Sequence, residues 1–207
     1  MVDVDWALKQ IGSIYHSERH FQLSLGAELG RMYGEERVRM EWEPIDGKRV
    51  DIGVRREDVT IPIELKYKTE SATVDDQGFG ETFSLSRQGA RDQAHYRFLQ
   101  DVQRIEEIVA EQGRYGYAIL LTNDSNYWHH SGYEALHDEM RVHEGAELSG
   151  SLHWTGETDS DWVKKEKWRD SIEFEGQYRA EWSDYDYRDD ISVSDNHEFR
   201  YLIFRVG

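Results

Sequence analysis

The sequence predicts an α/β domain in which a mixed β-sheet is flanked by helices. Hydrophobic residues recur at spacings of three and four over residues 5–33 and again over residues 86–112, which is the period of an amphipathic helix. Between and after these stretches, short segments either alternate hydrophobic and polar residues or run continuously apolar, as half-buried and fully buried strands do. The predicted order is therefore helix, three strands, helix, strand, with further strands behind.

The first helical stretch, residues 5–33, contains Gly12 and Ser13, which are positioned to divide it into two helices. Three strands follow, and the first two are joined by Asp46 and Gly47, a hairpin turn sequence. The strands are predicted in the segments RVRMEWEP, RVDIGVRR and VTIPIELKYKT.

Residues 70–84 are polar and contain glycine, which predicts a mobile loop. Ser86 is a candidate N-cap for the second long helix, which runs to about Gln112. The segment YGYAILLTND then predicts a buried strand, because its apolar run is continuous.

The last third of the chain is harder to interpret. Residues 126–170 are aromatic and acidic, with a helix expected at about 133–142, whereas SIEFEGQYRAEW and EFRYLIFRV alternate like antiparallel strands. We expect these strands to extend the same sheet. The prediction is thus a single domain over residues 1–207, with a core at about 14–122 and a C-terminal extension at about 123–207.

Composition restricts the class of protein. The chain has no cysteine, which excludes disulfides and thiolate metal sites. It has no apolar run of 18 residues, so no membrane span is expected, and its first residues lack the apolar core of a signal peptide. A cytoplasmic protein is the simplest prediction.

The net charge of -17 is unusual for a protein that would meet a polyanion. The charge is uneven, however, because residues 1–100 hold 18 acidic and 14 basic residues, and the remainder holds 24 and 11. Arginine outnumbers lysine 18 to 7. An acidic, lysine-poor composition suits a halophilic cytoplasm, where a Debye length of about 3 Å removes long-range repulsion. The alternative is an ordinary acidic protein that binds a basic partner.

Three residues carry the chemistry. Glu64 and Lys66 project from the same side of the third strand, about 7 Å apart. Asp51 lies on the preceding strand, and a tight turn would bring it beside Glu64. Two carboxylates suit Mg²⁺ or Mn²⁺, which prefers oxygen ligands, and a lysine can orient a water or neutralise developing charge. The main-chain carbonyl of Leu65 is a further candidate ligand.

Asp51, followed by a strand that ends Glu64-Leu65-Lys66, resembles the D…(D/E)-x-K signature of the PD-(D/E)XK, or restriction-endonuclease-like, nucleases. The resemblance covers about residues 14–122. It implies an αβββαβ core and a metal-dependent endonuclease that cleaves a nucleic acid, DNA in the first place, in restriction, repair or defence. It also implies Mg²⁺ or Mn²⁺ as cofactor and, by analogy with enzymes that cut both strands, a homodimer. Val50 departs from the proline in the family name.

Two features of the helices extend the resemblance. The family often carries an acidic residue on its first helix, and Glu18 in HSERHFQ is the candidate here, with an assisting role. Gln93 and Tyr96 are similar to the Q-x-x-x-Y element of RecB-like nucleases, although the spacing is one residue short.

Each of these residues also has a purely structural interpretation. Glu64 and Lys66 could form a solvated surface pair, and Asp51 could shape a turn. Glu18 could be an ordinary helix residue, as could Gln93 and Tyr96. The arginines of the second helical stretch could contact phosphate or pair with acids such as Glu107 at i,i+4 spacing; they are Arg87, Arg91, Arg97 and Arg104.

Two other functions remain open at this point. One is a catalytically inactive protein of nuclease-like fold that binds a nucleic acid or a protein partner. The other is an interaction protein whose acidic C-terminal half docks a basic partner.

Overall fold

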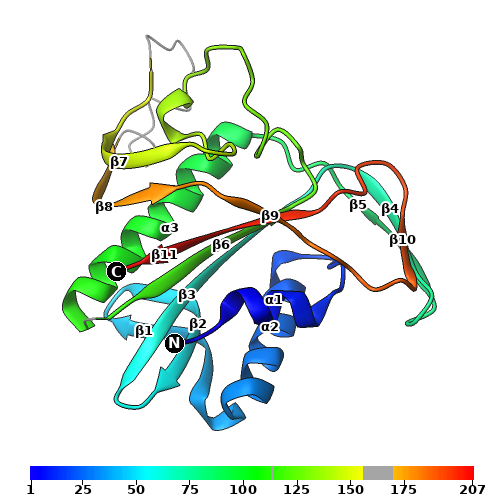
Figure 1. Cartoon of the computed structure of the whole chain (residues 1–207), viewed down its shortest axis with the longest axis horizontal. Coiled ribbons are helices and arrows are strands. Elements are labelled where there is room, and N and C mark those ends of the chain that lie inside the picture. Colours follow the sequence, from blue (N-terminus) through cyan, green and yellow to red (C-terminus); the bar gives the residue numbers. More distant parts are fainter. Residues whose placement is uncertain (113, 156–169) are drawn as a thin grey trace.

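The computed structural model describes residues 1–112, 114–155 and 170–207, and within them the chain folds around one mixed sheet (Figure 1). The sheet is built from Val38–Ile45 (β1), Lys48–Arg56 (β2), Val59–Lys68 (β3), Gly116–Thr122 (β6), Trp182–Asp184 (β9) and Arg200–Val206 (β11). The strand order is β1-β2-β3-β6-β11-β9. All neighbours are antiparallel except β3 and β6, which run parallel. The predicted α/β class and the mixed sheet are confirmed.

Helices cover both faces of this sheet. Val4–Ile11 (α1) and Glu18–Tyr33 (α2) pack on one face, together with the inward side chains of β2 and β3. Arg91–Gln112 (α3) packs on the other face against alternate residues of β6 and β11. Each face therefore has its own hydrophobic core, and β3 lies between them.

The predicted division of the first helical stretch is confirmed. Gly12 ends α1 in a left-handed conformation at φ 37°, which a residue without a side chain adopts easily. The hydroxyl of Ser17 then caps α2 by accepting a hydrogen bond from the backbone N–H of His20, at 3.2 Å. The cap places Glu18 at the first position of α2, at the end of β3.

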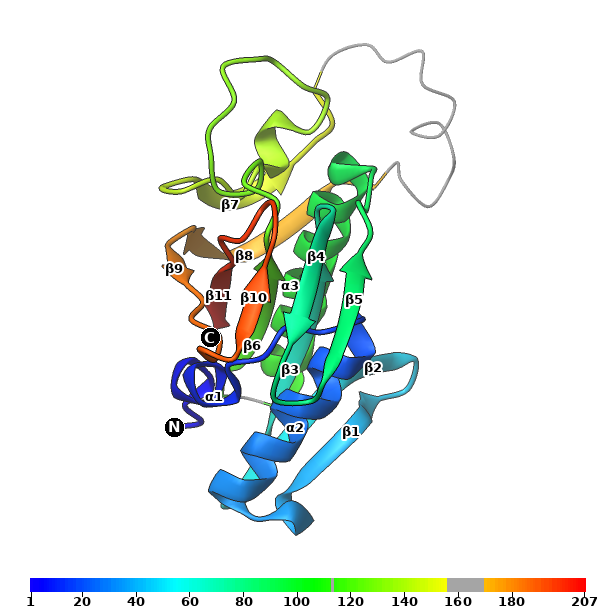
Figure 2. The same cartoon turned by 90° about the vertical axis from the view of Figure 1, so that its right-hand side faces the viewer.

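The loop predicted over residues 70–84 is wrong. This segment forms a hairpin of Ala72–Asp76 (β4) and Glu81–Leu85 (β5), and Ile191–Val193 (β10) adds a third strand beside β4 (Figure 2). Its apolar residues Val74 and Leu85 are buried in the core that α1 and α2 share. Alternate residues of the hairpin are buried, namely Ala72 and Val74 in β4 and Leu85 in β5, but the polar residues and glycines of the segment favoured a loop.

The predicted start of the second long helix at Ser86 is also wrong. Helix α3 begins at Arg91, directly after Ala90, whose φ of 59° is incompatible with a continuing helix. The Ser86 carbonyl instead accepts a hydrogen bond from the hydroxyl of Thr69 at 2.8 Å. This contact ties the segment before α3 to the end of β3.

The C-terminal part supplies two strands of the main sheet and a separate pair. As expected, the segment EFRYLIFRV joins the main sheet as β11, and β9 pairs with it. The expectation for SIEFEGQYRAEW is wrong, because most of this segment forms Ile172–Arg179 (β8), which pairs with Glu147–Leu152 (β7) in a separate sheet beside α3. Glu35–Arg37 (η1) and Asp138–Met140 (η2) are short 3₁₀ turns. The α-helix expected at about 133–142 is therefore wrong, because only the 3₁₀ turn Asp138–Met140 forms in this segment. Part of the 126–170 region, residues 156–169, lies outside the described residues.

In the described parts of the chain, no helix combines the length and apolar character needed to cross a bilayer.

Candidate active site

Successive side chains of β3 point to opposite faces of the sheet, so one set lies in the hydrophobic core and the other lies at the candidate site. Ile61, Ile63 and Leu65 are at most 1% exposed and pack in the core beneath α2. Glu64 and Lys66 point from the opposite face toward α3, as the two-residue period requires. Glu64 is only 4% exposed, so the interpretation of these two residues as a solvated surface pair is wrong.

Strand β2 separates from β3 where the site begins. Their antiparallel register runs from Arg56 opposite Val59 to Ile52 opposite Ile63. Beyond that pair, carboxylates replace β2 as acceptors for the N–H groups on this edge of β3, while the other edge stays paired with β6. The Asp51 Oδ2 accepts from the Leu65 N–H, and the Glu18 Oε2 accepts from the Tyr67 N–H, each at 2.8 Å.

This arrangement explains why Asp51 and Glu18 lie at the site. An N–H group that is buried and unpaired costs about 1–3 kcal/mol, so each carboxylate stabilises the frayed edge of β3. Gln22 holds the same edge from α2, because its side-chain amide donates to the Asp51 carbonyl at 2.9 Å and to Glu41 at 2.8 Å. The interpretation of Asp51 as a turn residue is wrong, because it lies within β2.

Helix α3 closes the site with two charged residues, Asp101 and Arg104. The Arg104 Nε donates to the Glu64 carboxylate at 2.9 Å, and its Nη2 contacts both Glu64 and Asp101 at 2.5 Å. Asp101 also pairs with the Lys66 ammonium at 2.7 Å and is 7% exposed in its side chain. Three carboxylates thus meet two cations in a largely buried cluster once Asp51 is included.

Burial has the largest effect on the pKa values of the Asp51 and Glu64 carboxylates at the site. It raises the pKa of Asp51, although hydrogen bonds from Glu64 and the Leu65 N–H act in the opposite direction. Burial, with the neighbouring charges of Asp101 and Asp51, raises the pKa of Glu64 to about 9, and Arg104 offsets only part of this. Glu64 therefore carries the proton in its hydrogen bond to Asp51 near neutral pH.

The pKa values of the two lysines of β3 are shifted in opposite directions. Burial alone would lower the pKa of Lys66, but the charges of Asp101 and Glu18 outweigh it, so the pKa is raised. Lys66 is consequently an ammonium that donates hydrogen bonds and does not accept a proton. Burial lowers the pKa of Lys68, and the nearby positive charge of Lys66 adds to the effect.

The donor set fits a divalent cation in part. Across the described residues, no three His, Cys, Asp or Glu side chains stand together as a preformed metal cage. However, Mg²⁺ commonly takes one or two carboxylates and completes its shell with water and substrate oxygens. Asp51 and Glu64 share a proton that a cation would displace, and Leu65 turns its N–H toward Asp51, which places its carbonyl on the same edge of β3. These residues fit the ion once Arg104 releases Glu64.

A basic pocket of about 400 Å³ opens beside this cluster, between the sheet and α3. It is lined by Lys48, Lys66, Arg97, Gln100, Asp101, Gln103, Arg104 and Glu107. Four of these residues are basic and two are acidic, against the strongly acidic composition of the chain. A larger pocket of about 830 Å³ lies elsewhere, next to His16 and Phe79, and touches none of the cluster residues.

Sequence reasoning missed the contribution of α3. Arg104 was expected either to contact phosphate or to pair with acids such as Glu107, yet it binds Glu64 and Asp101, whereas Lys48 pairs with Glu107 at 2.9 Å. The signal available was the spacing Arg97-x-x-x-Asp101-x-x-Arg104, which places three charges on one helix face.

The likeness of Gln93 and Tyr96 to a Q-x-x-x-Y element is not supported by their position. Tyr96 is fully buried in the core between α3 and β11, where its ring stacks on Trp154 at 5.3 Å. Its hydroxyl donates to the Asp170 carbonyl at 3.1 Å, away from Glu64 and Lys66.

No protein-family model, curated protein or solved structure matches this chain.

Proposed function

We propose that this chain is a metal-dependent nuclease that hydrolyses phosphodiester bonds, in DNA in the first place. The observation that carries the proposal is the meeting of Asp51, Glu64 and Lys66 at the point where β2 leaves β3. The order α2-β1-β2-β3-α3-β6 supports it, because it follows the αβββαβ arrangement of restriction-endonuclease-like nucleases with the hairpin of β4 and β5 inserted.

Asp51, Glu64 and the Leu65 carbonyl would hold Mg²⁺ or Mn²⁺. When bound, such an ion lowers the pKa of a water and neutralises charge on the phosphate. Attack of a water would form a new P–O bond and break the ester P–O bond, with the proton of the attacking water passing to solvent and the leaving oxygen taking a proton from solvent.

Lys66 would hold the attacking water or the phosphate oxygen on which negative charge accumulates. Its raised pKa keeps it protonated at neutral pH, so it acts as a hydrogen-bond donor and not as a base. Glu18 assists by fixing the Tyr67 N–H, which keeps Lys66 at its position on β3.

The basic pocket beside α3 is the surface on which the strand backbone would lie. Lys48, Arg97 and Arg104 line it, and arginine binds phosphate oxygens through its planar fork of donors. Arg104 would exchange Glu64 for a substrate phosphate, which would at the same time release Glu64 for the cation.

Cleavage assays on plasmid DNA, single-stranded DNA and RNA test the proposal. They compare Mg²⁺, Mn²⁺ and EDTA, at low salt and in about 1 M KCl, where the Debye length is about 3 Å. We expect cleavage that needs the metal and falls at least about 100-fold in Asp51→Ala and in Lys66→Ala, the scale on which oxyanion-stabilising groups act. Lys9→Ala, which alters an exposed pair on α1, is the matched control. Absence of cleavage by folded protein on every substrate would contradict the proposal.

One observation favours an inactive nucleic-acid-binding or protein-binding protein of this fold instead. Asp101 already pairs with Lys66 and Arg104, and Glu64 already accepts from Arg104, so these contacts hold the cluster together without a metal. A binding protein would retain nucleic acid in EDTA and would lose affinity equally in Lys66→Ala and Lys66→Met. The nuclease would show a metal-dependent turnover that neither variant keeps.

A further inference from the structure

A second pocket, of about 470 Å³, lies at the start of α3, on the side of that helix away from Glu64 and Lys66. Its walls come from the segment before α3, the first turns of α3 and the chain over residues 126–141. This is the size range of pockets that bind small molecules and nucleotides. None of the candidate active-site residues lines it, so it needs a separate account.

The N-terminus of α3 opens into this pocket through Gly89, Ala90, Arg91 and Asp92. The first N–H groups of a 22-residue helix have no acceptors within the helix, and the helix dipole places partial positive charge there. Both effects favour an anion. The Asp92 carboxylate takes one of these groups, since it accepts from the Gln93 N–H at 2.8 Å.

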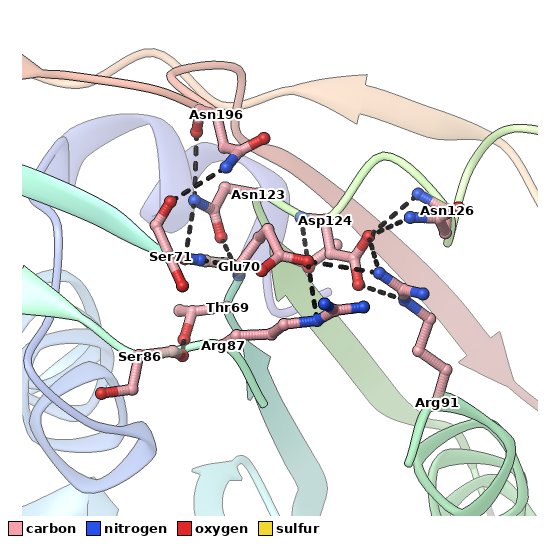
Figure 3. A network of polar contacts seen from close by, with 11 residues as sticks. Thr69, Glu70, Ser71, Ser86, Arg87, Arg91, Asn123, Asp124, Asn126 and Asn196 are labelled. Carbon is pink, nitrogen blue, oxygen red and sulfur yellow. Dashed lines mark hydrogen bonds and ion pairs between the residues drawn. The ribbon is translucent and has the colours of Figure 1, made fainter. Parts of the chain in front are cut away.

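Three arginines line the same pocket, against a single carboxylate, that of Asp92. Glu70 and Asp124, which do not line the pocket, bind two of these arginines. The Arg91 Nε contacts Asp124 at 2.5 Å, the Arg91 Nη2 donates to Asp124 and to Glu70 at 3.2 Å each, and the Arg87 Nε contacts Glu70 at 3.4 Å (Figure 3). A guanidinium has five N–H donors, so these contacts orient the arginines while leaving capacity for another acceptor.

Arg141 is fixed in the same way from the opposite wall. It pairs with Asp138 at 2.8 Å, donates to the Tyr133 carbonyl at 2.7 Å, and also donates to the Ser131 carbonyl at 3.3 Å and to the Ser131 hydroxyl. The three guanidiniums thus come from three segments, and each is held by acids that do not line the pocket.

His95 provides an observation, independent of the arginines and the helix N-terminus, that points to a ligand. Its side chain lines the pocket, is 2% exposed, and its Nδ1 finds no hydrogen-bond partner among the described residues. The ring is fixed between Tyr127 at 4.7 Å and His137 at 5.1 Å. A buried polar nitrogen without a partner costs free energy unless a ligand or water completes it.

We propose that this pocket binds a phosphate monoester, carried by a free nucleotide or by the phosphorylated end of a strand. A monoester has a charge of about -1.5 to -2 at neutral pH and three acceptor oxygens, which matches the three guanidiniums, the helix N-terminus and a donor at His95. A backbone diester carries one charge and would use them less well. The pocket binds without metal, so it is independent of the proposed nuclease activity.

Calorimetric titration of the full chain in EDTA tests this site. The probes are inorganic phosphate, thymidine 5′-monophosphate, and a thymidine hexamer with and without a 5′-phosphate. We expect binding that weakens at least about tenfold in Arg91→Gln and in Arg87→Gln, since each removes a charge-assisted hydrogen bond. Arg55→Gln, an exposed substitution on β2, removes the same charge elsewhere and should leave the affinity unchanged.

The outcomes distinguish a strand end from a free nucleotide as the source of the phosphate. Preference for the phosphorylated hexamer over the unphosphorylated one identifies a strand end, whereas binding of the mononucleotide without that preference identifies a free nucleotide. Arg87 is largely exposed, so the Arg87→Gln variant should stay folded. A shift of the His95 ring signals in nuclear magnetic resonance spectra when phosphate is added checks the site directly. Absence of binding by all probes in the millimolar range, or equal loss in Arg55→Gln, would overturn the proposal.

Discussion

Glu64 lies in surroundings that work against its own charge. It is buried under α3, next to the carboxylates of Asp51 and Asp101, and one arginine does not compensate for both effects. A residue with so unfavourable a charged form is typical of functional sites, where a ligand supplies the missing stabilisation. The cost falls on the stability of the unliganded protein.

Glu64→Gln should therefore stabilise the protein increasingly as pH rises. The pKa of Glu64 is near 4.5 in the unfolded chain and is raised to about 9 in the folded one. Its contribution to stability is fully present below about pH 4.5 and is lost as pH rises toward about 9, because only the unfolded state then releases the proton freely. Glutamine does not titrate, so the gain in Tm should grow over this window.

Thermal unfolding of both proteins across that pH range measures the difference. Glu57→Gln, at an exposed turn, is the matched control and should show no such trend. A difference in Tm that stays constant or shrinks with increasing pH would show that Glu64 is charged in the folded protein.

At the scale of elements, the site depends on an opening between two strands. Where β2 leaves β3, the carboxylates of Asp51 and Glu18 take over the N–H groups that a paired strand would have used. The residues that hold this edge of β3 are therefore also those of the candidate active site.

Glu18→Ala should lower the free energy of unfolding by about 1–3 kcal/mol, because it leaves the buried Tyr67 N–H without an acceptor. Glu18→Gln keeps an oxygen at that position and should cost less. Urea unfolding of the two variants and the wild type measures the difference. Equal stability of all three proteins would mean that Glu18 does not hold the edge of β3.

The elements predicted correctly are those whose pattern is local. Alternation in β1, β2 and β3 fixed which residues face the core, and from it the position of Glu64 and Lys66 followed. Asp101 and Arg104 could not be assigned, because their partners lie about 40 residues away and depend on how α3 is rotated against the sheet. The pairing of β10 with β4 could not be predicted for a similar reason, since these two strands lie far apart in the sequence.

At the scale of the whole molecule, the protein is acidic, whereas basic side chains outnumber acidic ones in the lining of both candidate pockets. The net charge is -17, yet the pocket beside Lys66 and the pocket at the start of α3 both carry more basic than acidic residues. Repulsion among the remaining surface acids opposes the compact state, and dissolved salt screens it.

Stability should consequently rise with salt. Between about 0.1 M and about 1 M KCl the Debye length falls from about 10 Å to about 3 Å. We expect a gain of at least about 1 kcal/mol, which corresponds to roughly 2–4 °C in Tm for a chain of this size. A scan of thermal unfolding against KCl measures it. A Tm that falls with added KCl would contradict the halophilic interpretation.

Cation binding at Asp51 and Glu64 is what separates a nuclease from an inactive protein of the same fold, and calorimetric titration of the full chain with MnCl₂ measures it directly. The prediction is binding in wild type that is lost in Asp51→Asn and kept in Asp46→Asn, whose substitution in the β1–β2 turn preserves a favourable turn sequence. Binding should also tighten in Arg104→Gln, which frees Glu64. A folded wild type that binds no Mn²⁺, or binding that survives Asp51→Asn unchanged, would contradict a metal-dependent site on β2 and β3.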